Sequence, residues 1–247
     1  MTRVVASIEA RMGASRLPGK VLADIGGVPA LGRLVRRLRR ARRVDDIVLA
    51  TTVDAADDPI VEWARSEALA VHRGSVDDVL GRVVGAHRDM ASEVIVELCG
   101  DTPLLDPQVI DLAVGRFAGG GCDVVSTTWR PSYPQGIDAQ VFRRDALEQV
   151  AATVDDPAVR EHVSLYFYEH PERYRIVHLE APPPLRLPDQ RLQMDWPEDL
   201  ALIREIYARL APRHGDAFGT AEIVALLRDE PALATLNAGR HEKAARP

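Results

Sequence analysis

Basic side chains and glycines alternate in a short polar stretch close to the start of the chain. The stretch EARMGASRLPGKVL directly follows an apolar run. Gly13 and Gly19 allow backbone N–H groups to approach phosphate oxygens, and Arg11, Arg16 and Lys20 can neutralise phosphate charge. The spacing matches neither the Walker A motif nor the G-x-G-x-x-G dinucleotide motif. The stretch therefore indicates a polyphosphate site of another type, with a solvated basic loop as the alternative.

Two aspartates come directly after short apolar runs that are typical of buried strands. Asp101 follows EVIVELCG, and Asp195 follows LQM and precedes the helix start WPEDL. Because the carboxyl ends of parallel strands meet at one edge of a sheet, two such carboxylates can share one Mg²⁺. Mg²⁺ between carboxylates and phosphates is the usual arrangement for nucleotidyl transfer. Either aspartate alone is more typical of a turn or helix cap, but with the basic loop they indicate a metal-assisted phosphoryl site.

Alternating apolar runs and amphipathic patterns must position these residues. The first half of the chain predicts strands joined by helices, which indicates an α/β fold with a mainly parallel sheet sandwiched by helices. Ligands of such sheets bind at the carboxyl ends of the strands, where the basic loop and Asp101 lie. The expected strands span residues 3–8, 46–52, 93–100 and 122–128, and two of the expected helices span 57–69 and 106–117.

The second half departs from this simple repeat. Residues 130–190 contain two prolines and a glycine near their start, one helical pattern over 156–170, and the proline-rich run APPPLRLPDQ. We interpret them as a region outside the simple repeat, within a single domain of residues 1–236. The polar tail of residues 237–247 is expected to be disordered.

Composition excludes several classes of protein. The 247 residues carry a net charge of −6, and no stretch approaches the roughly 18 consecutive apolar residues of a membrane helix. Cys99 and Cys122 lie apart, without metal-ligand spacing. These features predict a cytoplasmic protein with reduced thiols that binds neither nucleic acid nor membrane. The one strongly basic segment, GRLVRRLRRARR, has apolar residues at helical spacing, so its arginines predict a solvated helix face or, alternatively, a surface for a polyanion or partner.

Six sequence blocks, in order, resemble those of the cytidylyltransferases that make CMP-activated sugar acids, especially the SpsF-like spore coat polysaccharide branch. The blocks are ARMGASRLPGKVL, RGSVDDVLGR, GDTPLLDP, PQGIDAQVF, REHVSLYFYEHPERYRI and MDWPEDL. The resemblance extends from about Val4 to Leu210. It implies a Rossmann-like nucleotidyltransferase that transfers CMP from CTP to a small anionic acceptor, a sugar acid or a phosphonate, and releases pyrophosphate. The pathway would be polysaccharide, glycoconjugate or natural-product biosynthesis. It also implies a homodimer in which the inserted region 130–190 crosses to the partner.

The resemblance assigns roles to individual residues. Arg11, Lys20 and Asp101 would be catalytic, and Asp101 and Asp195 would bind Mg²⁺. Arg73 and Ser75 would lie near the base and ribose. The full nucleotide-binding set would be Ala10, Arg11, Met12, Gly13, Ser15, Arg16, Lys20, Arg73 and Ser75. The acceptor-binding candidates are Gln135, Asp138, Arg160, Glu161 and His162.

Three positions depart from the family pattern. Glu9 stands where glutamine is usual, Gln140 where glutamate is frequent, and Trp196 where threonine is more usual. Two alternatives therefore stay open: a degenerate nucleotide-binding member, and a glycosyltransferase that uses a nucleotide sugar. The second usually carries a D-x-D metal motif, which no expected strand end has, and it would release a nucleoside diphosphate instead of pyrophosphate.

Overall fold

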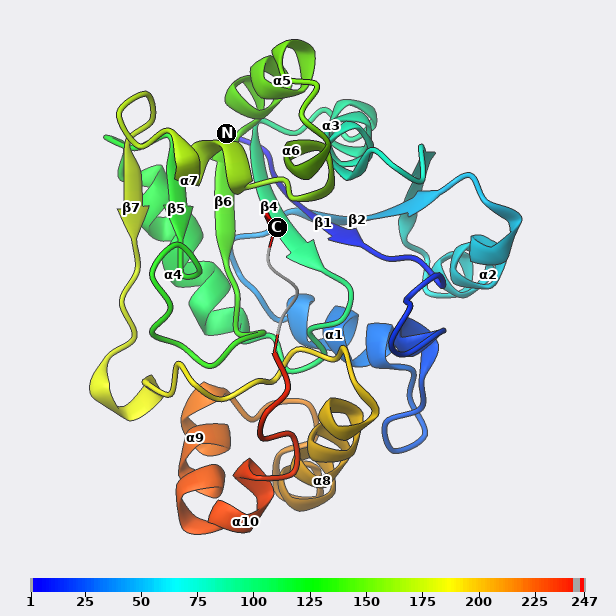
Figure 1. Ribbon diagram of the computed structural model, residues 1–247, viewed down its shortest axis with the longest axis vertical. Coiled ribbons are helices and arrows are strands. Elements are labelled where there is room, and N and C mark those ends of the chain that lie inside the picture. The colour runs from blue at the N-terminus through cyan, green and yellow to red at the C-terminus, as the bar shows by residue number, and fades with distance from the viewer. Residues whose placement is uncertain (1, 242–244, 247) are drawn as a thin grey trace.

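A seven-stranded sheet forms the centre of the protein, in the strand order β3-β2-β1-β4-β6-β5-β7 (Figure 1). The computed structural model describes residues 2–241 and 245–246. Neighbouring strands are parallel except β6, which runs antiparallel to both β4 and β5. The expected mainly parallel sheet is therefore confirmed. The strands are β1 (Val4–Glu9), β2 (Asp46–Thr52), β3 (Ala70–Gly74), β4 (Val94–Cys99), β5 (Val124–Ser126), β6 (Gln140–Arg143) and β7 (Ile176–His178).

Helices cover both faces of this sheet, because successive strand side chains point to opposite sides and both sides are apolar. Ala6 and Ile8 of β1 pack with α1, α2, α4, α8 and α9, whereas Ile95 of β4 packs with α3, α5, α6 and α7. None of the described helices is both long and apolar enough to span a membrane. The helices are α1 (Ala30–Leu38), α2 (Asp58–Ser66), α3 (Val79–Asp89), α4 (Pro107–Ala118), α5 (Arg144–Thr153), α6 (Pro157–Glu161), α7 (Leu165–Glu169), α8 (Pro197–His214), α9 (Thr220–Asp229), α10 (Pro231–Ala234) and the 3₁₀ helices η1 (Lys20–Leu22), η2 (Ala55–Asp57) and η3 (Pro183–Leu185).

Two arginines of the basic segment lie inside the protein, so the interpretation of a solvated face is wrong for them. Arg33 and Arg37 of α1 are 8% and 0% exposed. The Arg37 guanidinium donates hydrogen bonds to the carbonyls of Leu105, Asp216 and Phe218, and Arg33 pairs with the Asp216 carboxylate at 2.9 Å. Loop carbonyls and one carboxylate thus take the place of water around both guanidinium groups.

The segment 130–190 contributes two strands, β6 and β7, to the common sheet. Its expected single helix over 156–170 is wrong, because the chain forms α6 and α7 with a turn between them. The turn brings Val163, 3% exposed, into the core on the α3 side of the sheet and leaves His162 half-buried. His162 thus ends α6 as its C-cap, with its N–H donating to the Ala158 carbonyl at 2.8 Å, and the turn that follows buries Val163.

The start of the expected tail packs against the fold. Asn237 is 4% exposed, and its amide donates to the Arg191 carbonyl at 3.0 Å and to the Asp199 carboxylate at 2.7 Å. Arg240 pairs with Glu198 at 2.5 Å. The remainder of the expected tail includes residues 242–244 and 247, which lie outside the described residues.

Candidate active site

The basic loop leaves the carboxyl end of β1 and closes on itself before η1. The Met12 carbonyl accepts hydrogen bonds from the N–H groups of Ala14 and Gly19. Gly19 has φ +70°, a left-handed conformation that glycine adopts without a Cβ penalty. The Met12 N–H donates to the Asp57 carboxylate at 2.6 Å, which ties the loop to η2, the 3₁₀ helix that follows β2. Local hydrogen bonds and one glycine thus determine the shape of the loop.

Lys20, the first residue of η1, lies between the two aspartates that the sequence singled out. Its Nζ is 2.5 Å from an Asp101 oxygen and 2.7 Å from an Asp195 oxygen. Both aspartates are buried, at 9% and 7% exposure. Asp101 follows β4 as predicted, but Asp195 lies in an irregular segment before α8, so the strand expected before it is wrong. The structure nevertheless brings all three groups together.

Asp195 is surrounded by cations. Arg16 lies 3.0 Å and Arg191 3.1 Å from its second oxygen. Burial alone would raise the pKa of Asp195, but the hydrogen bonds and charges of Lys20 and Arg16 outweigh it and lower the pKa. Burial alone would lower the pKa of Lys20, but Asp101 and Asp195 raise it above its ordinary value. Lys20 and Asp195 are therefore charged near neutral pH.

The basic loop and the aspartates line one cavity of about 400 Å³, which we call the loop cavity. Most residues predicted to bind nucleotide lie here, with both predicted metal ligands. They are Ala10, Arg11, Gly13, Ser15, Arg16, Lys20, Asp101 and Asp195.

The donor atoms of this cavity fit Mg²⁺. Asp101 and Asp195 approach from separate parts of the chain and converge on one cation, the Lys20 ammonium. Carboxylate oxygens are hard ligands of the kind that Mg²⁺ prefers. The position of the ammonium shows that both carboxylates can contact the same small cation.

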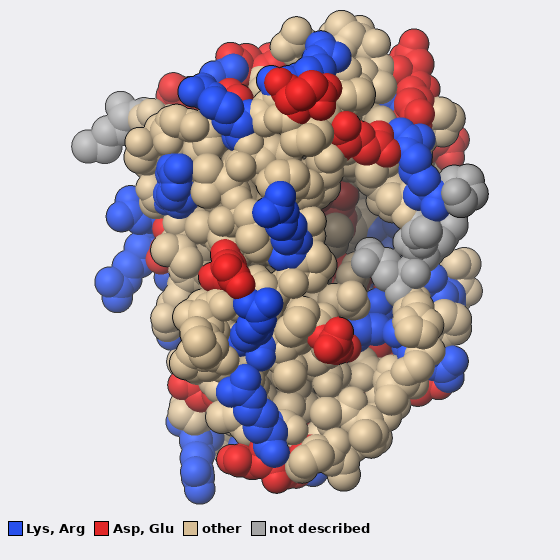
Figure 2. Space-filling model, turned by 60° about the vertical axis from the view of Figure 1, so that its left-hand side comes forward, with Lys and Arg blue, Asp and Glu red and all other residues tan. Residues whose placement is uncertain are grey.

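A second cavity of about 220 Å³, which we call the acidic cavity, adjoins the loop cavity. Figure 2 shows a hollowed face of the molecule in which acidic side chains lie below the surrounding surface. Five residues line both cavities: Glu9, Cys99, Glu161, His162 and Gln193. The acidic cavity also contains Glu97, Thr127, Thr128, Tyr133, Gln135, Asp138, Gln140 and Ser164. Four of the five predicted acceptor residues, Gln135, Asp138, Glu161 and His162, therefore line it.

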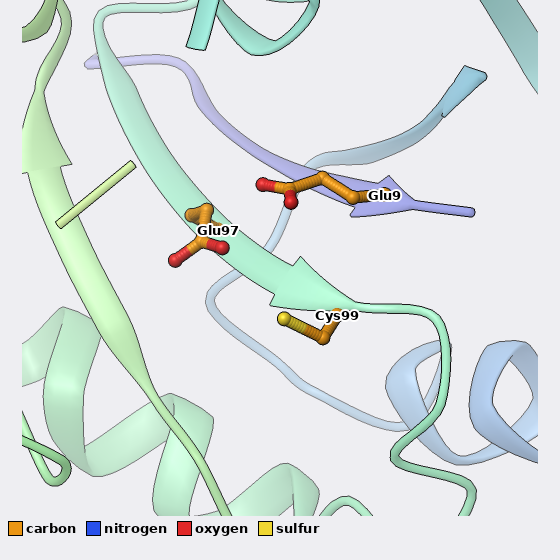
Figure 3. A group of neighbouring side chains, drawn as sticks. All are labelled: Glu9, Glu97 and Cys99. Carbon is orange, nitrogen blue, oxygen red and sulfur yellow. The ribbon is translucent and has the colours of Figure 1, made fainter. Parts of the chain in front are cut away.

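Glu9 of β1 and Glu97 of β4 form a carboxyl pair at the wall of the acidic cavity. Their side chains project from adjacent strands to the same side of the sheet, beside Cys99 (Figure 3). Gln140 donates its amide N–H to Glu97 at 2.5 Å and accepts a hydrogen bond from the Tyr168 hydroxyl at 2.5 Å. The amide orientation of Gln140 is thus set from both ends.

The carboxyl pair has raised pKa values. Burial, followed by the charge of Glu97, raises the pKa of Glu9 well above 4.5, and burial also raises the pKa of Glu97. The two carboxyls therefore titrate as a coupled pair, and the raised pKa values favour a proton held between them. Burial, with the charges of Glu97 and Glu9, likewise raises the pKa of the Cys99 thiol well above 9.0, so in the metal-free site this thiol is protonated at neutral pH and is a poor nucleophile.

Four predicted residues line neither cavity. Arg73 pairs with Asp58 at 2.7 Å, and Arg160 pairs with Asp78 at 3.4 Å. Ser75 is exposed, and Met12 is half-buried with its backbone engaged in the loop. The side chains of Arg73, Arg160 and Ser75 are thus placed outside both cavities, whereas Met12 packs against Gly19 and supports the loop.

Sequence reasoning overlooked Glu97, although one signal was present. Glu97 is the charged residue in the apolar run VIVELC, and it is 3% exposed. A carboxylate in a buried strand costs free energy unless it has a partner or a function. Sequence reasoning also overlooked Gln193, which lines both cavities and donates to Asp101 at 3.3 Å.

Trp196, one of the three departures from the family pattern, lies outside both cavities. Its ring packs against the Arg16 guanidinium, 5.1 Å from the ring centre.

Comparisons with known proteins place this geometry in a family. The cytidylyltransferase family model matches residues 5–222. The spore coat polysaccharide biosynthesis protein SpsF of Bacillus subtilis is 33% identical over 241 residues, which cover 95% of this chain and 98% of SpsF. The 3-deoxy-manno-octulosonate cytidylyltransferase of Anaeromyxobacter dehalogenans is 34% identical over 187 residues, with 68% and 74% of the two chains covered.

Solved structures agree in fold. A cytidylyltransferase from Leptospira borgpetersenii superposes with a TM-score of 0.90 at 25% identity, covering 99% of this chain and 100% of the other. CMP:2-keto-3-deoxy-manno-octonic acid synthetase, solved with CTP, shares the fold at a TM-score of 0.65 and 17% identity, with 84% and 99% of the two chains covered. The chain therefore belongs to the cytidylyltransferase family and is a nucleotidyltransferase.

Proposed function

We propose that the protein transfers CMP from CTP to a sugar acid or a phosphonate, with Mg²⁺ as cofactor and pyrophosphate as the second product. The observation that supports this is the Lys20 ammonium between Asp101 and Asp195, beside a glycine-containing loop. At such a point the ammonium can bind the phosphate oxygens of a triphosphate, and the two carboxylates can bind the metal ion that accompanies it.

The chemistry needs positioning and charge neutralisation more than covalent help from the protein. An acceptor oxygen attacks the α-phosphorus of CTP, and the bond to the bridging oxygen breaks with its electron pair leaving on pyrophosphate. Arg11 and Lys20 neutralise the charge that grows on the leaving group. Mg²⁺, held by Asp101 and Asp195, would withdraw charge from the phosphate oxygens when bound. Lys20 and Arg16, both paired with Asp195, keep this carboxylate ionised.

The acidic cavity is proposed as the acceptor site. It shares Glu161, His162 and Gln193 with the loop cavity, so an acceptor oxygen would have a short path to the α-phosphorus. His162 lies in the turn between α6 and α7 and can hydrogen-bond the attacking hydroxyl.

A homodimer is also proposed, with part of the region 130–190 at its interface. This is supported by β7, an edge strand of the sheet whose three residues are only half-buried in the single chain, since exposed edges are usually covered or paired. Light scattering after size exclusion would give twice the chain mass of 27.1 kDa. A monomer at micromolar concentration would contradict the dimer.

The first test is thermal-shift binding of CTP, UTP, ATP and GTP, each with and without Mg²⁺. A ligand that binds only the folded state raises the melting temperature by mass action. We expect a shift with CTP and Mg²⁺ that is lost in Lys20→Ala and retained in Arg36→Ala, which removes an exposed cation of α1. No shift with any nucleotide would contradict the proposal.

The second test is the identity of the released product. Pyrophosphate release from CTP in the presence of an acceptor supports nucleotidyl transfer. Release of a nucleoside diphosphate from a nucleotide sugar would instead support a glycosyltransferase. Binding of CTP without turnover for any acceptor would favour a degenerate nucleotide-binding protein.

A further inference from the structure

The charged residues that line the acidic cavity are all acidic. Four carboxyl groups line it, from Glu9, Glu97, Asp138 and Glu161, whereas none of its described lining residues is a lysine or an arginine. Its remaining polar groups are hydroxyls, amides and the imidazole of His162. An anionic group placed among these carboxylates would lose its hydration without gaining a counter-charge, which is costly.

The cations near the carboxyl pair belong to the loop cavity. Arg82 lowers the pKa of Glu9 by its charge, but it lines the loop cavity, and its guanidinium donates to the carbonyls of Ser75 and Val76. Arg11, Arg16 and Lys20 also line the loop cavity. The anionic end of a sugar acid or phosphonate is therefore better matched to the loop cavity than to the acidic one.

The carboxyl pair can still accept a hydrogen bond from a ligand. Gln140 occupies one oxygen of Glu97, which is 3% exposed, and fixes the direction of this carboxyl group. The Oε1 atom of Glu9 is shielded from solvent and has no hydrogen-bond partner among the described residues. Both carboxyls project to the same side of the sheet (Figure 3). A buried acceptor oxygen without a donor costs free energy, which a ligand with N–H groups recovers.

We infer that the part of the acceptor that enters the acidic cavity carries a protonated amine, as in an amino sugar, and that Glu9 and Glu97 bind this ammonium. This inference rests on the proposed function, since it concerns the acceptor of the same reaction. A neutral hydroxyl would satisfy the hydrogen bonds of the pair, but only an ammonium also compensates its charge. When it binds, the proton shared by the two carboxyls is released to solvent and the ammonium takes its place.

The experiment compares matched probes in calorimetric titrations, with CTP and Mg²⁺ present. Glucosamine, glucose and glucuronate share one ring and differ in charge; ethanolamine, ethylene glycol and glycolate form a smaller set with the same charges. In at least one set we expect the ammonium probe to bind about tenfold or more tightly than the neutral probe, and the carboxylate probe most weakly. Repetition in buffers of different ionisation enthalpy should show proton release with the ammonium probe alone.

Substitutions of Glu9 and Glu97 test whether these two carboxyls cause the preference for the ammonium probe. Glu9→Gln and Glu97→Gln keep the side-chain shape and remove one carboxyl each, so either should abolish most of the preference and the proton release. Glu62→Gln, which removes an exposed carboxyl of α2, should change neither. Equal or tighter binding of the neutral or carboxylate probes, or a preference that survives in both variants, would overturn the inference.

The same samples separate this inference from the proposed function. If CTP raises the melting temperature but no ammonium probe of either size binds preferentially, the inference fails and CMP transfer stands. If CTP itself produces no shift, the proposed function fails first.

Discussion

The two adjoining cavities hold buried carboxylates by different physical means. In the loop cavity, Asp101 and Asp195 face Lys20, and Asp195 also faces Arg16 and Arg191. In the acidic cavity, Glu9 and Glu97 face each other and an amide. Counter-charges lower the pKa of Asp195, whereas burial and mutual repulsion raise the pKa of Glu9. In the loop cavity the carboxylates and cations are ionised and paired, so a phosphate or a metal ion can replace one partner of a pair. In the acidic cavity the carboxyl pair holds a proton, which a cationic ligand can displace.

Removal of Lys20 should have the largest effect on the loop cavity. In Lys20→Ala the ammonium is lost between two buried carboxylates and from the leaving-group side of the triphosphate. We expect pyrophosphate release to fall on the order of 10³-fold, as for the loss of other groups that stabilise developing charge. Circular dichroism should still show a folded chain. Wild-type turnover in this variant would contradict the assignment of the reacting phosphates to the loop cavity, and with it the contrast between the two cavities.

Neutralising Asp101 tests the metal part of the same cavity. Asp101→Asn keeps the shape and one oxygen but removes the charge that faces Lys20. We expect a roughly 10²-fold lower rate at limiting Mg²⁺, and a higher Mg²⁺ concentration at half-maximal rate. Asp77→Asn, at an exposed aspartate before α3, is the matched control and should behave like the wild type. An unchanged Mg²⁺ dependence in Asp101→Asn would argue against a metal at this carboxylate.

Adding a carboxyl to the acidic cavity should destabilise the fold. Gln140→Glu places an acid where an amide now lies 2.5 Å from Glu97, so we expect a loss of about 1–3 kcal/mol in the free energy of unfolding at pH 8. At pH 5 the loss should be smaller, since protonation relieves the repulsion. The double variant Glu9→Gln/Gln140→Glu should recover most of the stability, measured by a double-mutant cycle. Additive effects would show that the three side chains do not act as one unit.

The smallest expected effect concerns the pH dependence of stability. The pKa of Glu9 in the folded chain lies above 4.5, so the folded state keeps a proton that the unfolded chain releases as the pH rises. This contribution to stability is present below pH 4.5 and is lost as the pH rises through the folded-state pKa. Glu9→Gln lacks this loss, and its melting temperature should exceed that of the wild type by a few degrees at pH 8 but not at pH 4. The control Glu62→Gln should show no such pH-dependent difference.

Local sequence signals predicted the loop cavity better than the acidic one. The glycines and cations around Lys20 form one contiguous loop, and Asp101 follows an apolar strand, so both have signals within a few residues. Asp195 also lies beside Lys20, but no strand among the described residues directly precedes it. The segment before it forms an isolated β-bridge, between Gln135 and Arg191, in place of the expected strand. Its position depends on tertiary contacts that periodicity does not encode.

The acidic cavity depends on long-range pairing. Glu9 and Glu97 become neighbours only because β1 pairs with β4, with Ser7 opposite Glu97 and Glu9 opposite Cys99. The turn at His162 depends on burial of Val163, which a helical pattern over 156–170 conceals. These features require the register of the sheet and the packing of the core, which the sequence pattern alone does not specify.

Two departures from the family pattern proved to be related in space. The resemblance predicts a glutamine at the position of Glu9 and a glutamate at that of Gln140, and the two positions flank the same carboxyl group, Glu97. The exchange of one amide and one acid around Glu97 leaves the number of carboxyl groups unchanged. Each departure taken alone indicates altered chemistry, whereas the two together give this wall the same number of carboxyl groups as the pattern that the resemblance predicts.

The buried guanidinium of Arg37 links parts of the chain that are far apart in sequence. It lies on α1, and the carbonyls that it holds belong to the loop after β4 and to the loop between α8 and α9. If α9 detached, Arg37 would keep its charge but lose two of these three acceptors inside an apolar layer. We therefore expect partial unfolding of the carboxy-terminal helices to weaken the packing of α1 against the sheet that carries both cavities. Heat or denaturant should unfold the chain in one cooperative transition, and truncation before α9 should destabilise the distant site.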